Sequence, residues 1–201
     1  MVMRLWMAGA AVLVLGGCGS SDSSSATPAV STIPPATSTS STTEPVPSTT
    51  VVCPVFTDTD VKSDGFPGML SVLVGSDVRV GADPCHERFV LELQGTGQFP
   101  GWWVRYQTPP LLDDPRGEPV DVAGSAFIVV TVESWMTNME GEGYKGPRRI
   151  TPANVSHVKE LVMLGNFESV TIWAIGLDQQ RAFKVSTLDN PPRLVIDIQT
   201  S

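Results

Sequence analysis

Few residues of this 201-residue chain have the types and spacing that catalysis requires. The histidines are His86 and His157, and Ser125 lies in Gly-Ser-Ala rather than in the Gly-x-Ser-x-Gly turn of many hydrolases. Asp113 and Asp114 are adjacent, whereas the two carboxylates of a glycosidase face each other across a sugar. We therefore expect no enzymatic activity and no cofactor.

The first 18 residues have the anatomy of a secretory signal. Arg4 supplies a positive start, residues 8–15 form an apolar block too short to span a bilayer, and small residues lead to Cys18. The run Leu-Gly-Gly-Cys that ends at Cys18 resembles the lipobox of bacterial lipoproteins. That resemblance implies a cysteine that is diacylated, with chains such as palmitate, and that attaches the mature chain to the membrane. An ordinary cleaved signal and a retained anchor are the alternatives, and all three put the domain outside the cytoplasm.

The two other cysteines, Cys53 and Cys85, remain as a pair if Cys18 carries lipid. In an exported domain such a pair usually forms a disulfide, and a loop of about thirty residues gives about 3–4 kcal/mol in the chain-entropy model. Two free thiols or a metal pair are the alternatives. No Cys-x-x-Cys spacing favours a metal, and a disulfide would use up Cys85, the neighbour of His86. We expect the disulfide and no metal site.

Composition separates a tether from a folded domain. Residues 19–52 are dominated by serine, threonine and proline and hold no aromatic residue, so they cannot bury enough apolar surface to fold. We expect a signal peptide over residues 1–17, a lipidated cysteine and disordered linker over residues 18–52, and one domain over residues 53–201. The formal net charge of −8 argues against nucleic acid and anionic lipid head groups, which both favour basic patches.

The pattern of the domain is mostly β. The predicted strands, rich in alternating or β-branched residues, are residues 69–74 (with 77–80 as an extension), 88–94, 102–106, 126–132, 169–175, 182–188 and 193–199. Residues 153–164 fit a helix or a strand, and we favour a strand. Residues 133–153 form a long loop, of a length that is usually functional or disordered. Segments 89–94 and 194–199 share the same alternation of residues, with an acidic residue at the same position. They are either equivalent strands in facing sheets or alike by chance.

The long loop carries side chains that could bind a ligand. Sugar rings stack on aromatic side chains, and Trp135 and Tyr144, in or beside the loop, are the aromatic residues that we expect to be exposed. A guanidinium pairs with a carboxylate at two points. Arg148 and Arg149 could therefore meet the carboxylates of peptide stems, or could simply offset an acidic surface.

Two more arginines, Arg88 and Arg193, precede the strands that share one pattern. The favoured role of each is a salt bridge to Glu87, Glu92 or Asp197. The alternative role is the polar rim of a binding site on a sheet face. Both arginines are therefore candidate binding residues.

Five segments, in this order, carry a resemblance to a known family. They are Glu87–Leu93; Pro100 and Gly101 with Val104 and Tyr106; Val120, Val122, Gly124 and Ala126; Gly165–Glu168 with Val170, Trp173 and Ile175–Leu177; and Pro191–Asp197. Over roughly residues 68–199 the chain resembles the AMIN-like domain of actinobacterial lipoproteins and secreted proteins. It is more distantly similar to the AMIN domains beside amidases and secretins. The resemblance implies an all-β fold, a small β-sandwich of two mainly antiparallel sheets.

AMIN domains hold envelope proteins at peptidoglycan. The resemblance therefore implies an exported, lipid-anchored module that faces the cell wall and contacts peptidoglycan or another wall glycan. The alternative is a module that docks another envelope protein without binding glycan. The chain departs from the family pattern in its Cys85-His86 pair, in the insertion over residues 135–157, and in lacking a fused amidase or secretin domain, which weakens the targeting role.

Overall fold

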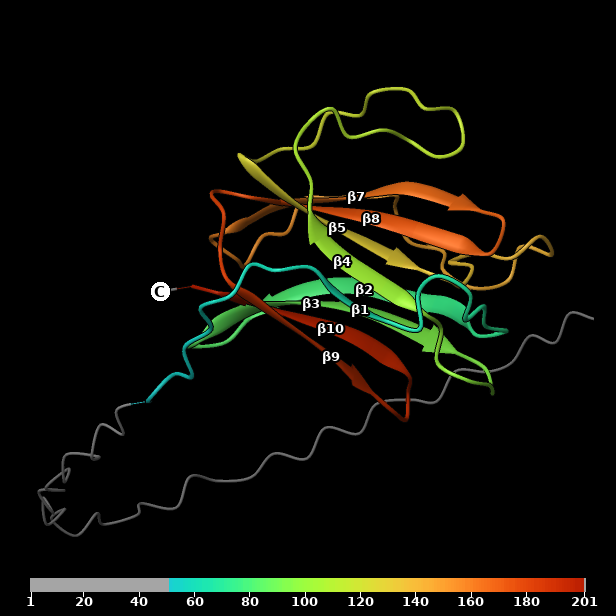
Figure 1. Cartoon of the computed structure of the whole chain (residues 1–201), viewed down its shortest axis with the longest axis horizontal. Coiled ribbons are helices and arrows are strands. Elements are labelled where there is room, and N and C mark those ends of the chain that lie inside the picture. Colours follow the sequence, from blue (N-terminus) through green and yellow to red (C-terminus); the bar gives the residue numbers. More distant parts are fainter. Residues whose placement is uncertain (1–50, 201) are drawn as a thin grey trace, which may run out of the picture. The chain divides into compact units, whose positions relative to one another are not determined.

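The structure, a computed structural model, describes residues 51–200 and contains ten strands and no helix there. The predicted signal over residues 1–17, Cys18 and nearly all of the predicted linker over residues 18–52 lie outside the described residues. Within the described part, no helix is long and apolar enough to cross a membrane. The strands form two antiparallel sheets that pack face to face (Figure 1), which confirms the predicted all-β sandwich.

Both sheets join strands from early and late parts of the domain. Sheet A has six strands in the order β1–β4–β5–β8–β7–β6, and sheet B has four in the order β2–β3–β10–β9. The strands of sheet A are β1 (Lys62–Asp64), β4 (Trp102–Tyr106), β5 (Ala126–Val132), β8 (Val170–Leu177), β7 (Val158–Phe167) and β6 (Arg149–Ile150). The strands of sheet B are β2 (Val74–Ala82), β3 (His86–Gln94), β10 (Arg193–Gln199) and β9 (Phe183–Leu188).

Alternation along the strands builds one core between the sheets. On β3, Phe89, Leu91 and Leu93 point inward and are fully buried, while Arg88 faces outward. Trp173 of β8 is also fully buried in this core. Each buried Leu or Phe contributes about 1.5–3 kcal/mol of hydrophobic free energy before conformational entropy is subtracted. The core therefore fixes which face of each strand is left for solvent and ligands.

The ambiguous segment at residues 153–164 contributes a strand. β7 begins at Val158 and pairs with β8, so the favoured strand is confirmed and the helical alternative is wrong. Leu161 points into the core between the sheets, while Val162 and Leu164 lie in a second apolar cluster on the opposite face. Because both faces of β7 are covered, the segment has no clear polar and apolar alternation.

The second face of sheet A is covered by the chain between β4 and β5. Residues 107–125, the yellow-green loop drawn above sheet A in Figure 1, place Leu111 against this face, and we call them the cover loop. Arg149 fixes the cover loop, because its guanidinium binds Glu160 at 2.6 Å and donates to the Asp121 carbonyl at 3.0 Å.

The strand predicted at residues 69–74 is wrong, because β2 starts only at Val74. The segment before β2 is bound by Glu133 instead. The Glu133 carboxylate accepts the N–H groups of Gly68 and Met69 at 2.7 and 2.8 Å. These bonds tie the segment to the loop after β5 rather than to a neighbouring strand.

The matching segments at residues 89–94 and 194–199 lie side by side. β3 and β10 are neighbours in sheet B, with Arg88 directly opposite Asp197. The facing-sheet explanation of their likeness is therefore wrong. Paired antiparallel strands present the same faces to core and solvent, so a shared alternation is what this position requires.

Candidate functional site

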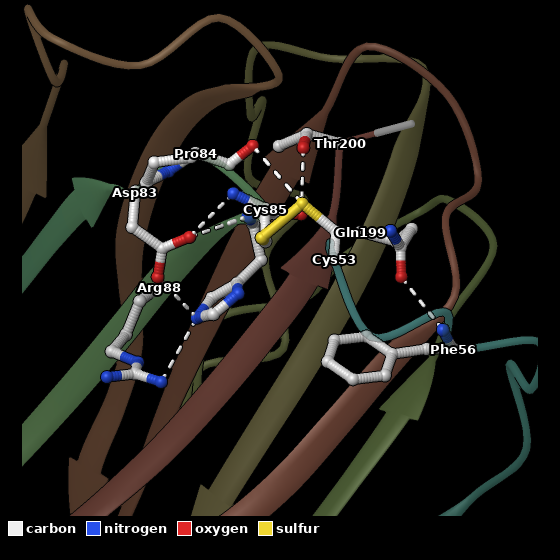
Figure 2. The surroundings of a disulfide bond; sticks show 9 residues. Cys53, Phe56, Asp83, Pro84, Cys85, Arg88, Gln199 and Thr200 are labelled. Carbon is white, nitrogen blue, oxygen red and sulfur yellow. Dashed lines mark hydrogen bonds and ion pairs between the residues drawn. A yellow bond between two sulfur atoms is a disulfide. The ribbon is translucent and has the colours of Figure 1, made fainter. Parts of the chain in front are cut away.

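A short segment at the start of the domain is pinned across one end of sheet B. Cys53 and Cys85 form the predicted disulfide (Figure 2), and we call residues 53–61 the strap. The Phe56 N–H donates to the Gln199 side chain at 2.8 Å. The strap therefore runs from the start of β3 across the end of β10.

The outer face of sheet B carries charged side chains, which we call the charged face. Side chains alternate along a strand, so this face holds the residues between the inward-pointing apolar positions. Each of the four strands contributes at least one charged residue. The members are Asp77, Arg79, Arg88, Glu92, Lys184, Arg193 and Asp197. The predicted binding residues Arg88 and Arg193 thus lie on the same face.

Arg88 is held firmly by its partner on β10. Asp197 accepts hydrogen bonds from Arg88 Nε at 2.6 Å and from Nη2 at 3.0 Å. His86 lies against the same pair, with its Nε2 atom 3.1 Å from Asp197 Oδ1. Hydrogen bonding to Asp197 raises the pKa of Arg88 above its ordinary value, despite partial burial. The salt bridge to Asp197 that the sequence favours for Arg88 is confirmed.

Arg79 is held in a similar way on the edge strand β2. Its Nη1 atom lies 2.7 Å from Asp77 and its Nη2 atom lies 2.9 Å from Glu92. Burial opposes the charge, but the bonds to these two acids outweigh it and raise the pKa of Arg79. The side chains of Arg79 and Arg88 remain 43% and 46% exposed, so both guanidiniums can still meet a ligand.

A hollow of about 310 Å³ lies beside these two arginines. It is lined by residues 79–82 of β2 together with Asp83, Arg88 and Val90. Gly81 is opposite Arg88 in the register, and a Cβ atom placed on Gly81 meets no atom within 4 Å. The hollow is therefore open because position 81 has no side chain. Its floor is apolar and its rim carries both signs of charge.

Asp83 supplies the negative charge of this rim from the turn between β2 and β3. Its Oδ1 atom accepts the N–H groups of Cys85 and His86 at 2.8 and 3.0 Å. Partial burial opposes the charge, but these bonds outweigh it and lower the pKa of Asp83. Figure 2 shows Asp83 and Arg88 on the same side of the disulfide. An ionised carboxylate is thus fixed beside the hollow.

The aromatic candidates lie away from the charged face. Tyr144 is only 7% exposed and packs edge-on against Trp173, so the expectation that it is exposed is wrong. The Tyr144 hydroxyl donates to the Pro147 carbonyl at 2.9 Å, which folds this part of the loop back over the core. Trp135 is half-buried, and its carbonyl accepts a hydrogen bond at the start of β2.

Arg148 and Arg149 lie on the other sheet, at the β6 edge of sheet A. Arg149 is committed to the cover loop through Glu160 and the Asp121 carbonyl. Arg148 is exposed, and its Nη2 atom makes one long contact of 3.4 Å with a carbonyl of β7. The structure therefore does not bring this pair together with Arg88 and Arg193.

Arg193 does not form the predicted salt bridge to Glu87, Glu92 or Asp197. It lies opposite Glu92 in the register, but Glu92 binds Arg79 instead. The Arg193 Nε atom donates to a carbonyl in the preceding turn at 3.1 Å. Arg193 is therefore a half-exposed cation at the far end of the charged face.

Sequence reasoning missed Arg79, Gly81 and Asp83. Residues 77–80 were expected only to extend a strand, although their alternation also puts two charged residues on one face. That alternation is the signal that could have revealed Arg79. No sequence pattern could have revealed Gly81. Its missing side chain opens the hollow only because Arg88 lies opposite on β3, and the sequence alone does not show that pairing.

Fold and site together define a β-sandwich module that presents a charged face with a small hollow. Among residues 51–200, no three His, Cys, Asp or Glu side chains are grouped to hold a metal ion. Residues 73–200 match the AMIN-like domain, and the chain belongs to this family. AMIN-like domains are non-catalytic binding or targeting domains of extracytoplasmic envelope proteins. No curated protein and no solved structure matches the chain.

Proposed function

We propose that this chain is an exported, lipid-anchored envelope protein that binds peptidoglycan or another wall glycan. Residues 1–17 act as the signal peptide, Cys18 carries the lipid, residues 18–52 form the linker, and residues 53–201 form the binding domain. Membership of the AMIN-like family supports an envelope role. The disulfide suits an oxidising compartment outside the cytoplasm.

The observation that carries the proposal is the hollow beside Arg79 and Arg88 on the charged face. Peptidoglycan presents carboxylates on its peptides, and a guanidinium binds a carboxylate at two points. The charged face offers cations and anions together, which suits a polymer that carries both carboxylates and amines. The net charge of −8 disfavours nucleic acid as a competing ligand.

Co-sedimentation with protein-free sacculi tests the proposal. The chain from residue 18 onward, with Cys18→Ser to remove the lipid and with the disulfide intact, should pellet saturably. The double variant Arg79→Gln/Arg88→Gln should lose most of the pelleting. Trp135→Ala and Arg148→Ala should retain it, and the opposite pattern would move the binding surface to the long loop.

Salt is varied in the same assay, because screening weakens exposed charge pairs. Pelleting should fall as ionic strength rises and should persist in part at physiological salt. If the unsubstituted chain does not pellet even at low salt, binding to the wall polymer is contradicted.

A protein partner is the second candidate function, and the long loop favours it. Met139 is 85% exposed, in a hairpin closed by a bridge between Thr137 and Gly143. Exposed methionines adapt to varied protein surfaces. In this case the chain should pellet with sacculi that keep their proteins and not with stripped ones, and Met139→Ser should weaken that pelleting.

A further inference from the structure

We propose that the hollow beside Arg79 and Arg88 takes the free terminal carboxylate of a short peptide with a methyl-sized side chain next to it. This inference rests on the proposed wall function, because it names the part of the wall that occupies the site. The peptide stems, and not the sugar strands, are then the direct ligand.

Two guanidiniums face the hollow and are ordered before any ligand arrives. Arg88 uses Nε and Nη2 for Asp197, and its Nη1 group bonds to none of the residues 51–200. Arg79 uses Nη1 and Nη2 for two acids of the charged face, and each of these nitrogens has a second hydrogen. Because the acids already hold both side chains, a ligand carboxylate loses little free energy in ordering them.

The floor of the hollow sets the size of the ligand. Gly81 leaves the space open, and the neighbouring Ala82 and the buried Val90 make the lining apolar. A volume of about 310 Å³ is at the small end of ligand pockets. Such a space admits one or two small residues of a peptide rather than a run of sugar rings.

Asp83 sets the polarity of the ligand. Its carboxylate is ionised and 40% exposed at the rim, and Oδ2, which lies 2.8 Å from His86 Nε2, has a second lone pair for a ligand donor. A ligand carboxylate next to Asp83 would be repelled, whereas a peptide N–H or an ammonium group of the ligand would be attracted to Asp83. The ligand therefore directs one carboxylate to the arginines and a donor to Asp83, as the last residue of a peptide can.

Titration with a defined peptide tests the site. The ¹⁵N-labelled chain from residue 18, with Cys18→Ser, is titrated with N-acetyl-alanyl-alanine in its L and D forms. The matched control is the same peptide with a terminal carboxamide. We expect saturable amide shifts at Gly81, Ala82 and Arg88 at roughly millimolar carboxylate peptide, and none with the carboxamide. Equal responses to both peptides, or no response to either, would overturn the assignment.

Gly81→Val fills the hollow without removing a charge. Gly81 does not have a positive φ and its added side chain has room, so the variant should keep its melting temperature. It should weaken peptide binding by about tenfold or more. Ser186→Val, on β9 of the same face and outside the hollow, is the control and should bind normally. Unchanged binding by Gly81→Val would overturn the proposal.

Sacculus pelleting separates this inference from the proposed function. If the chain and Gly81→Val both pellet and neither binds the peptide, the wall function stands and the peptide site is wrong. If the chain binds the peptide and does not pellet, the site stands and the wall function is wrong. If the unsubstituted chain binds the peptide and pellets, and Gly81→Val does neither, both the wall function and the peptide site are supported.

Discussion

One partly buried residue network joins the two sheets. The Tyr106 hydroxyl of β4 donates to the Arg181 carbonyl at 2.7 Å and accepts the Arg181 N–H at 2.9 Å. Asp178 binds the Arg181 guanidinium at 2.8 and 3.0 Å, and His157 Nδ1 lies 2.9 Å from its carboxylate. Arg181 Nη1 also donates to the Gln199 carbonyl at 3.1 Å. The connection between β8 and β9 is thereby fixed to both sheets.

Asp178→Asn should destabilise the domain at neutral pH by about 1–2 kcal/mol, because a charged hydrogen-bonded pair is weakened. The bond from Arg181 lowers the pKa of Asp178 well below its ordinary value, against the opposing effect of burial, and His157 adds to the lowering. A depressed folded-state pKa stabilises the fold above the unfolded-state value of about 4, and this contribution is lost as the pH falls further.

Urea denaturation of both proteins across pH checks this prediction. The difference in the free energy of unfolding should be constant near neutrality and should shrink below about pH 4. A difference that does not change with pH would contradict an ionised Asp178 as its source.

Arg149→Ala should destabilise the domain, and its neighbour Arg148 is the matched control. Removing the Arg149 guanidinium leaves the buried Glu160 carboxylate with one remaining bond, from the Ala123 N–H at 2.8 Å. An under-satisfied buried carboxylate costs about 1–3 kcal/mol. Arg148→Ala should change the stability by less than about 0.5 kcal/mol, because this side chain is exposed. Equal losses in guanidinium denaturation would contradict the fixing of the cover loop by Arg149.

Among the elements, the strap depends most on a single bond. Cys85→Ser and Cys53→Ser should each lower the melting temperature of the oxidised domain to the same extent, because each removes the same disulfide. The two cysteines are 32 residues apart, which corresponds to about 3–4 kcal/mol in the chain-entropy model. Thermal melts with and without reductant check this. A melt of either variant that equals the unsubstituted one under non-reducing conditions would contradict the prediction.

The strands β3, β9 and β10 of sheet B could be predicted because each buries one face, so polar and apolar residues alternate. The predicted start of β2, at residue 69, was wrong. β7 is covered on both faces, so its sequence fitted a helix as well as the favoured strand, and the pairing with β8 confirms the strand. Arg88 was recognised as a candidate, but the hollow beside it depends on Gly81, which meets it only across the β2–β3 pairing. Tyr144 was misjudged because its Gly- and Pro-rich surroundings suggested exposure, while the ring packs on Trp173.

For the whole molecule, the proposed lipid on Cys18 decides where the domain works. Two acyl chains hold a protein at a bilayer stably, whereas one chain gives only marginal binding. In a bacterium that processes lipoproteins, the full chain should incorporate a palmitate analogue and fractionate with membranes. Cys18→Ser should lose both properties, and Cys53→Ser, as control, should keep them. Label that survives Cys18→Ser would contradict lipidation at this residue.

The disulfide also decides how the domain bears mechanical load. A pull on the chain ahead of the strap reaches Cys53 and passes through the sulfur–sulfur bond to Cys85, at the start of β3. The strap and β1, which pairs with β4 over only three residues, lie outside this force path. If the proposed anchor and wall contact load the domain, the disulfide passes the force into sheet B rather than into the strap and β1. In the reduced domain the same pull would first load the strap and the three-residue pairing of β1 with β4.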